Sequence, residues 1–341
     1  MTRQISEKIR VLGLFMTCAV VFYHCPSVGG DWVRGSVDAA ANRFTDFVYG
    51  QMGTLAMSHF FAVTGYLLFQ NYTLQSYPAK LRRRVSTLLV PYLVWQVLTV
   101  LLKLVVNRET VGLWEFVSKT FFFLRYPFNG ALWYVYGVFF LAALSPVLLP
   151  LLKDRKNGLI GVLALSFLAE IKNYYTIPVV SEWLVYTYID NILTYVPSFL
   201  VGCYCGRFCR DGDFAAGGKL ILSICFAAIL LDGTMPGVLA AITVKIMPMA
   251  ILYLLPALPK MAGWKVHSLT FMVYAMHQPL IGVMWAILSR VYAVVPLPAS
   301  VCNLTTRLAV LGVAMTAAAV IHGVLSRICP RALACLTGGR G

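Results

Sequence analysis

A histidine at the end of the first apolar stretch is the residue best suited to chemistry. His24 follows the apolar residues 11–23, and Arg10 stands at the base of that stretch. An imidazole within a membrane-length helix is costly, so it indicates a functional site. Positions 10 and 24 are about four helical turns apart, so both side chains project from one face and can line one cavity. The alternative is a histidine bonded to a backbone carbonyl, with Arg10 only anchoring the inner end of the helix.

The composition is that of an integral membrane protein. Of the 341 residues, 60% are hydrophobic and 12% are charged, and no long polar block could form a separate soluble domain. Segments such as residues 132–152 and 220–231 lack the polar stripe of a soluble helix. A β-barrel would need short alternating strands instead. The sequence therefore predicts an all-α polytopic helix bundle that forms a single domain over residues 1–341.

Runs of about 20 apolar residues can cross the hydrocarbon layer as helices. The first such run is retained, because Phe22, Tyr23 and His24 replace the small residues of a signal-peptide cleavage site. The chain is thus expected to be a multi-pass protein of the inner, or cytoplasmic, membrane. About ten transmembrane helices are predicted, at residues 9–28, 52–71, 85–105, 131–151, 157–172, 190–206, 219–232, 237–257, 268–289 and 302–326.

Positive charge predicts the orientation of the bundle. With the N-terminus inside, the expected inner segments carry most of the lysines and arginines, so both termini are predicted to be cytoplasmic, with a tail from about residue 327. The net charge of +15 is then largely a topology signal. Because the basic residues are spread over separate loops, nucleic-acid binding is not expected.

Several motifs follow the first helix in a recognisable order. Together they resemble the membrane-bound acyltransferase family 3, which includes O-acetyltransferases of bacterial surface polysaccharides, and the resemblance covers roughly residues 5–285. The motifs are Ser58–Phe69, Lys80–Arg84, Leu89–Trp95, Ala131–Tyr136, Tyr195–Gly202 and Tyr274–Leu280.

The resemblance assigns positions to the family's functional residues. It places His24 on the family histidine, residues 60–65 on the second-helix pattern, and Arg82, Arg83 and Arg84 on the arginine cluster. This sequence departs from the family pattern at two positions. Gly13 occupies the usual place of the family arginine, so Arg10 would act from about one turn lower. Thr64 replaces a serine and keeps the hydroxyl.

The resemblance implies O-acyl transfer, with acetyl-CoA as co-substrate and no bound cofactor. Moving an acyl group from a thioester to a hydroxyl needs a base, and His24 is the candidate, or else a transient acyl carrier. The Arg82–Arg84 cluster would bind the donor's phosphates from the cytoplasm, whereas contact with lipid headgroups is its alternative role. The acceptor would be a cell-surface or envelope glycan or a lipid-linked sugar. No glycine-rich phosphate loop is present, so nucleotide hydrolysis is not expected.

Other polar and aromatic residues of the expected helices are candidates for the cavity wall, namely Ser58, His59, Thr64, Tyr92, Trp133, Glu170 and Lys245. His59 could face the same cavity, although a lone histidine at such a position is more often a packing residue with one hydrogen bond. Glu170 could orient a histidine, although pairing with Lys172 at the interface is a simpler account. Lys245 and Arg307 are expected to face a cavity or protein and not lipid. The triplet 277–279, His-Gln-Pro, marks an irregular helix that shapes the cavity.

Two further expectations concern metals and alternative functions. The spacing of Cys203, Cys205 and Cys209 does not follow zinc-site patterns, so no metal is predicted. The competing interpretation is a transporter or flippase of a lipid-linked sugar, and a structural or regulatory membrane subunit is a third. No inverted repeat or pair of broken helices, which transporters often show, is evident. A transport route would be lined by Arg10, His24, Lys245 and Arg307.

Overall fold

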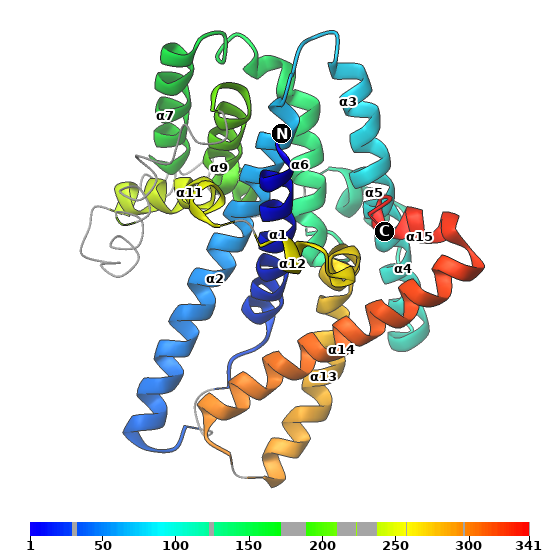
Figure 1. Ribbon diagram of the computed structural model, residues 1–341. Helices are drawn as coiled ribbons and strands as arrows, with labels where there is room; N and C mark the ends of the chain where they lie inside the picture. The colour runs from blue at the N-terminus through cyan, green and yellow to red at the C-terminus, as the bar shows by residue number, and fades with distance from the viewer. Residues whose placement is uncertain are drawn as a thin grey trace. The chain divides into compact units, whose positions relative to one another are not determined.

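The computed structural model describes residues 1–28, 33–122, 126–171, 189–209, 223, 237–256, 258–295 and 297–340. Within these ranges the regular elements are all helices, and no strand occurs among them (Figure 1). The prediction of an all-α protein is therefore confirmed for the described part of the chain.

The helices follow the expected crossings, except that residues 219–232 fall almost entirely outside the described ranges. Each remaining crossing overlaps at least one helix. The elements are α1 (Arg3–His24), α2 (Gly35–Phe69), α3 (Tyr77–Arg84), η2 (Val85–Leu89), α4 (Val90–Asn107), α5 (Leu113–Phe121), η3 (Gly130–Leu132), α6 (Trp133–Leu144), η4 (Ser145–Leu148), α7 (Arg155–Ile171), α9 (Ile189–Phe208), α11 (Gly237–Leu254), α12 (Pro259–Ala262), η5 (Lys265–Leu269), α13 (Thr270–Val294), α14 (Ala299–Ile328) and α15 (Pro330–Thr337).

By length and composition, 5 helical stretches of the described chain could each cross a membrane. The count of ten crossings and the cytoplasmic position of both termini stay predictions. The stretches are Gly35–Phe69, Tyr77–Val106, Gly130–Leu148, Lys265–Val294 and Ala299–Ile328.

The chain divides into two compact units, and α1 and α2 contribute to both. Unit 1 comprises Met1–Leu12 and Met57–Gly263, and unit 2 comprises Gly13–Ala56 and Trp264–Gly341. In unit 1, α9 packs against α7 and α11. In unit 2, the consecutive helices α13 and α14 pack against each other (Figure 1).

Two helices of unit 1 approach each other through glycines. A Cβ added at Gly202 of α9 would collide with the backbone carbonyl of Ala62 in α2, and one added at Gly206 would collide with that of Tyr66. Gly202 and Gly206 are four positions apart and so lie on one face of α9, which is the small-xxx-small pattern of close helix pairs in membranes. Because position 62 meets 202 and position 66 meets 206, α2 and α9 run in the same direction here.

In unit 2, polar side chains of α2 bind successive turns of α14. The Asp38 carboxylate accepts hydrogen bonds from the N–H groups of Ala299 at 2.9 Å and Ser300 at 3.0 Å, which caps the N-terminus of α14. One turn further along, the amides of Asn42 and Asn303 bond to each other. We call this set the α2–α14 polar ladder. It explains why α2 begins well before the expected crossing 52–71: the polar residues of its first turns have partners within the protein.

Candidate active site

His24 is the last residue of α1, because Pro26 lacks the N–H that would continue the helix. Its side chain is half-buried and makes no hydrogen bond with the described residues. The imidazole lies beside the ring of His277, with ring centroids 5.2 Å apart and planes 38° apart. It also meets the ring of Tyr23 at a centroid distance of 5.0 Å. The structure thus places His24 against another helix of unit 2, with both ring nitrogens free of bonds to the described chain.

Arg307 of α14 binds the chain on both sides of His24. Pro26 leaves the carbonyl of Phe22 without its usual helical donor, and the Nε–H of Arg307 donates to that carbonyl at 3.1 Å. A second nitrogen, Nη2, donates to the hydroxyl of Ser27 at 3.1 Å. The first of these bonds satisfies a carbonyl that the helix leaves without a donor, and the second fixes the turn that follows the histidine.

The charge of Arg307 is compensated inside the protein. The side chain is only 1% exposed and lies on α14 one turn beyond Asn303 of the α2–α14 polar ladder. Nη2 lies 3.9 Å from a carboxylate oxygen of Asp46, and the guanidinium lies 3.9 Å above the ring of Tyr49. Nη1 donates to the carbonyl of Asn303 at 3.0 Å. The expectation that this arginine faces protein and not lipid is therefore confirmed.

The chain just beyond Ser27 is held by the same face of α14. The Oδ1 of Asn303 accepts a hydrogen bond from the N–H of Val28 at 2.5 Å, and its Nδ2 donates to the Val28 carbonyl at 3.2 Å. Asn42 donates to that carbonyl as well, at 3.1 Å. Asn303 and Arg307 are one turn apart on α14, so a single helix face sets the exit of the chain from α1.

His277 is the functional candidate that the sequence interpretation missed. It lies on α13 and is 0% exposed. Its Nδ1 is 2.5 Å from the carbonyl oxygen of Tyr274, which can only accept, so Nδ1 carries the proton and Nε2 keeps its lone pair. Nε2 has no hydrogen-bond partner. The sequence carries a signal for it, because His277 is a histidine within an apolar helix, as His24 is.

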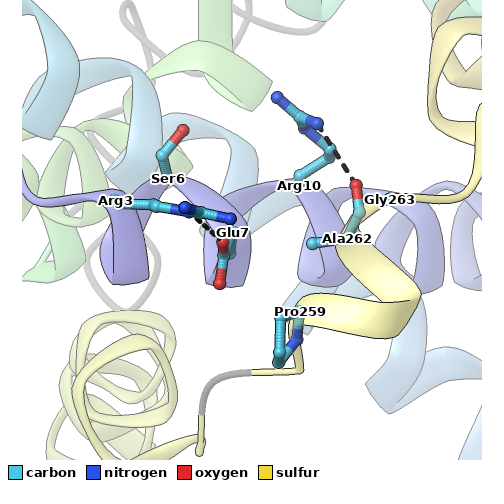
Figure 2. A pocket seen from close by; sticks show the side chains of 7 residues that line it. All are labelled: Arg3, Ser6, Glu7, Arg10, Pro259, Ala262 and Gly263. Atoms are coloured by element: carbon cyan, nitrogen blue, oxygen red, sulfur yellow. Dashed lines mark hydrogen bonds and ion pairs between the residues drawn. The ribbon is translucent and has the colours of Figure 1, made fainter.

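Arg10 lies in a pocket of unit 1 near the start of α1. Its Nη1 donates to the carbonyl of Ala262 at 3.2 Å, and nearer the start of the same helix Arg3 forms a salt bridge with Glu7 at 2.9 Å (Figure 2). His24 is not among the lining residues, so the predicted cavity shared by Arg10 and His24 stays a prediction. The pocket has a volume of ≈ 300 Å³ and is lined by Arg3, Ser6, Glu7, Arg10, Pro259, Ala262 and Gly263.

The arginine cluster occupies the end of α3. Arg82 and Arg83 are exposed and Arg84 is half-buried, and none of their side chains makes a hydrogen bond or salt bridge with the described residues. Lys80, in the same segment, behaves differently. Its ammonium donates to the carbonyls of Leu68 at 2.9 Å and Gln70 at 2.7 Å, which caps the end of α2. The side-chain donors of the three arginines are thus not used by the described part of the chain.

Several cavity candidates have structural partners. Thr64 lies 3.3 Å from the hydroxyl of Tyr134, which also donates to the carbonyl of Phe60 at 3.2 Å. The hydroxyl of Tyr92 donates to the carbonyl of Thr120 at 2.8 Å. These contacts join α2 to α6 and the start of α4 to α5. Structural roles account for both Thr64 and Tyr92.

Trp133 and Lys245 meet at a shared aromatic ring. The ammonium of Lys245 lies 4.2 Å from the ring centroid of Tyr195, and Trp133 meets the same tyrosine at 6.0 Å. Lys245 is only 4% exposed, as expected for a lysine that faces protein. Trp133 and Lys245, far apart in sequence, therefore share one aromatic cluster of unit 1.

Ser58 and His59 are the least explained of the candidates. Both are buried on α2, and neither the hydroxyl of Ser58 nor Nδ1 of His59 has a hydrogen-bond partner. The ring of His59 contacts Phe60 edge-on at 5.9 Å. The side chain of Glu170 lies outside the described residues. No group of three or more His, Cys, Asp and Glu side chains suited to a metal comes together in the described part of the chain.

Comparison with known families identifies the protein class. The acyltransferase domain of acyltransferase family 3 matches residues 10–324. The match begins within α1, ends within α14 and includes residues of both units. Neither a curated protein nor a solved structure gives a significant match to the chain. A family match over most of the length is decisive for membership, and it agrees with the resemblance carried by His24 and the motifs that follow it. The chain belongs to acyltransferase family 3 and is a membrane acyltransferase.

Proposed function

We propose that this protein transfers an acetyl group from cytoplasmic acetyl-CoA to a hydroxyl of a cell-surface or envelope glycan, with His24 as the general base. The observation that carries the proposal is the state of His24 in a chain of this family. The imidazole is half-buried, free of hydrogen bonds to the described chain, and held at the end of α1 by the contacts of Arg307. A nitrogen without a protein partner is available to a substrate hydroxyl.

The proposed reaction is a single acyl transfer. As the hydroxyl oxygen bonds to the acyl carbon, its proton passes to His24, and the carbon–sulfur bond breaks. The proton then passes from His24 to the sulfur of CoA. General base catalysis of this kind contributes about 10²–10⁴-fold to the rate when the base is held in place. The thioester itself supplies the driving force.

The donor is proposed to dock at the Arg82–Arg84 cluster. CoA carries several phosphates, and planar guanidinium groups bind phosphate through multiple charge-assisted hydrogen bonds. The free donors of the cluster support this role, whereas Lys80 is occupied by the end of α2. Arg10 uses one nitrogen for the Ala262 carbonyl and is proposed to assist with its remaining donors.

The transporter alternative is less well supported. It required Arg307 to line a translocation route, but that side chain is almost fully buried and its donors bind Phe22, Ser27 and Asn303. All three nitrogens of this guanidinium are bonded within the protein, so a structural role accounts for Arg307 without a translocation route.

Transfer of label distinguishes the two functions. Membranes containing the protein are incubated with acetyl-CoA labelled in the acetyl group, and the glycan and lipid-linked sugar fractions are then counted. We expect label in one of these fractions, and none with membranes that lack the protein. A transporter would leave the label on CoA, and that result would overturn the proposal.

Neutralising the arginine cluster should weaken donor binding. The double substitution Arg82→Gln with Arg83→Gln is expected to raise the KM for acetyl-CoA about 10-fold or more, with little change in kcat, because each removes charge-assisted bonds to phosphate. The exposed Lys153 of unit 1 provides the control, and Lys153→Gln should leave the KM unchanged. If the cluster contacts lipid headgroups instead, the double variant will keep the wild-type KM and lose its dependence on anionic lipid.

A further inference from the structure

We propose that His277 is a positioning residue for His24: its Nε2 accepts a hydrogen bond from His24 and stabilises the imidazolium formed during acyl transfer. The inference rests on the proposed function, because it assigns a role within the same site. It extends that function from one histidine to a pair. Both residues belong to unit 2.

The first argument is the unpaired nitrogen of His277. Nδ1 is bonded to the Tyr274 carbonyl, so Nε2 is a buried acceptor with no partner. Leaving such an acceptor unpaired is costly, so a neighbouring group that can donate to it is expected to do so. A neutral imidazole with one nitrogen fixed as a donor can serve only as an acceptor at the other.

The second argument is which group can supply that donor. Among the described residues, the ring contacts of His277 are His24, at 5.2 Å between centroids, and Tyr274, at 5.7 Å. Tyr274 lies on the same helix and already provides the carbonyl for Nδ1. His24 gains a second N–H when it takes a proton, so it becomes a donor on both sides of its ring.

The third argument is that Asp46, the acid that contacts Ser27 just after His24, is already engaged. In acid–base sites a third group usually orients the base, most often a carboxylate. Asp46 accepts a hydrogen bond from Ser27 at 2.6 Å and lies 3.9 Å from Arg307. Among the described residues, the buried Nε2 of His277 is an acceptor without a partner on a ring that contacts His24, and it can orient the base.

The proton balance of the step is unchanged by His277. The proton of the acceptor hydroxyl moves to one nitrogen of His24 as the new carbon–oxygen bond forms. The N–H at the other nitrogen of His24 donates to Nε2 of His277, and this proton stays on His24. When the carbon–sulfur bond breaks, His24 returns the first proton to the sulfur of CoA, and both histidines are neutral again.

The test compares two substitutions in the full-length membrane protein. His277→Gln keeps an acceptor near the position of Nε2, and His277→Leu removes it. We expect His277→Leu to lower kcat by about 10–100-fold, the change expected from loss of one hydrogen bond to a charged group, with the KM for acetyl-CoA unchanged. His277→Gln should retain clearly more of the wild-type kcat. Rates are expressed per folded molecule, measured from thermal unfolding of the purified protein.

Controls separate this inference from the proposed function. His322→Leu removes another histidine of unit 2, on α14, and should keep the wild-type kcat. Where His277→Leu does not fold, His277→Met fills the space with a flexible apolar side chain and replaces it. Equal kcat values for the glutamine and apolar variants, or a wild-type kcat for the apolar variant, would overturn the role of His277. If His24→Ala abolishes transfer in that same case, the proposed function stands and only the histidine pair fails.

Discussion

Replacing His24 with alanine is expected to abolish acyl transfer and to leave the protein folded in the membrane. The base would be lost, which lowers the turnover by about 10²–10⁴-fold. The fold should tolerate the change, because the His24 side chain makes no hydrogen bond with the described residues and the end of α1 is held by backbone contacts to Arg307 and Asn303. The measurement is transfer of labelled acetyl groups by purified protein, corrected for the folded fraction.

Two further variants define the meaning of that result. His24→Gln keeps the polarity and approximate size of the side chain but cannot take a proton, so it should be as inactive as the alanine variant. His322→Ala, a half-buried histidine of α14, should retain the wild-type rate. More than a tenth of the wild-type turnover in folded His24→Ala would contradict the role of His24 as the base.

The second large effect is expected at the contact of α2 with α9. Gly202→Ala places a methyl group where the Ala62 carbonyl stands. The atoms that it would meet are backbone atoms of Ala62, which cannot rotate away as a side chain could. Overpacking of this kind typically costs about 1–3 kcal/mol, and Gly202→Leu should prevent the two helices from meeting at all. We expect a lower unfolding temperature for the alanine variant and little monodisperse protein for the leucine variant.

Gly282 of α13 gives a matched control, since nothing lies within 4 Å of a Cβ added there. Gly282→Ala should be neutral or stabilising by up to about 1 kcal/mol, because alanine favours a helix over glycine. Equal unfolding temperatures for the two alanine variants would show that α2 and α9 do not pack through Gly202. Thermal unfolding of both proteins in the same detergent makes the comparison.

The helices themselves could be predicted from sequence because long apolar runs have few structural alternatives in lipid. His24 could be singled out from the sequence because a histidine at the end of an apolar run is costly in lipid. The start of α2 at Gly35 could not be predicted from apolar length. Its first turns are polar, and they are buried only because Asp38 and Asn42 find partners on α14. Such partners depend on tertiary contacts across most of the chain.

The two residues now placed around His24 illustrate the same limit. His277 was noticed only with its neighbouring proline, and its contact with α1 arises from packing between helices at opposite ends of the sequence. Arg307 was expected to face protein, but its partner at the Phe22 carbonyl exists because of Pro26. In contrast, Gly202 and Gly206 carried a readable signal. Their four-residue spacing within an apolar segment indicates a close helix pair.

The anchoring of α1 by α14 has a consequence for biogenesis. The first helix enters the membrane early in translation, but the side chains that hold its end, Asn303 and Arg307, belong to the last long helix. Until that helix arrives, the Phe22 carbonyl has no donor, and once it arrives, a guanidinium without its partners is costly in lipid. A prematurely released polypeptide should therefore be enzymatically silent, and a mispaired last helix should present an arginine that membrane quality control can recognise.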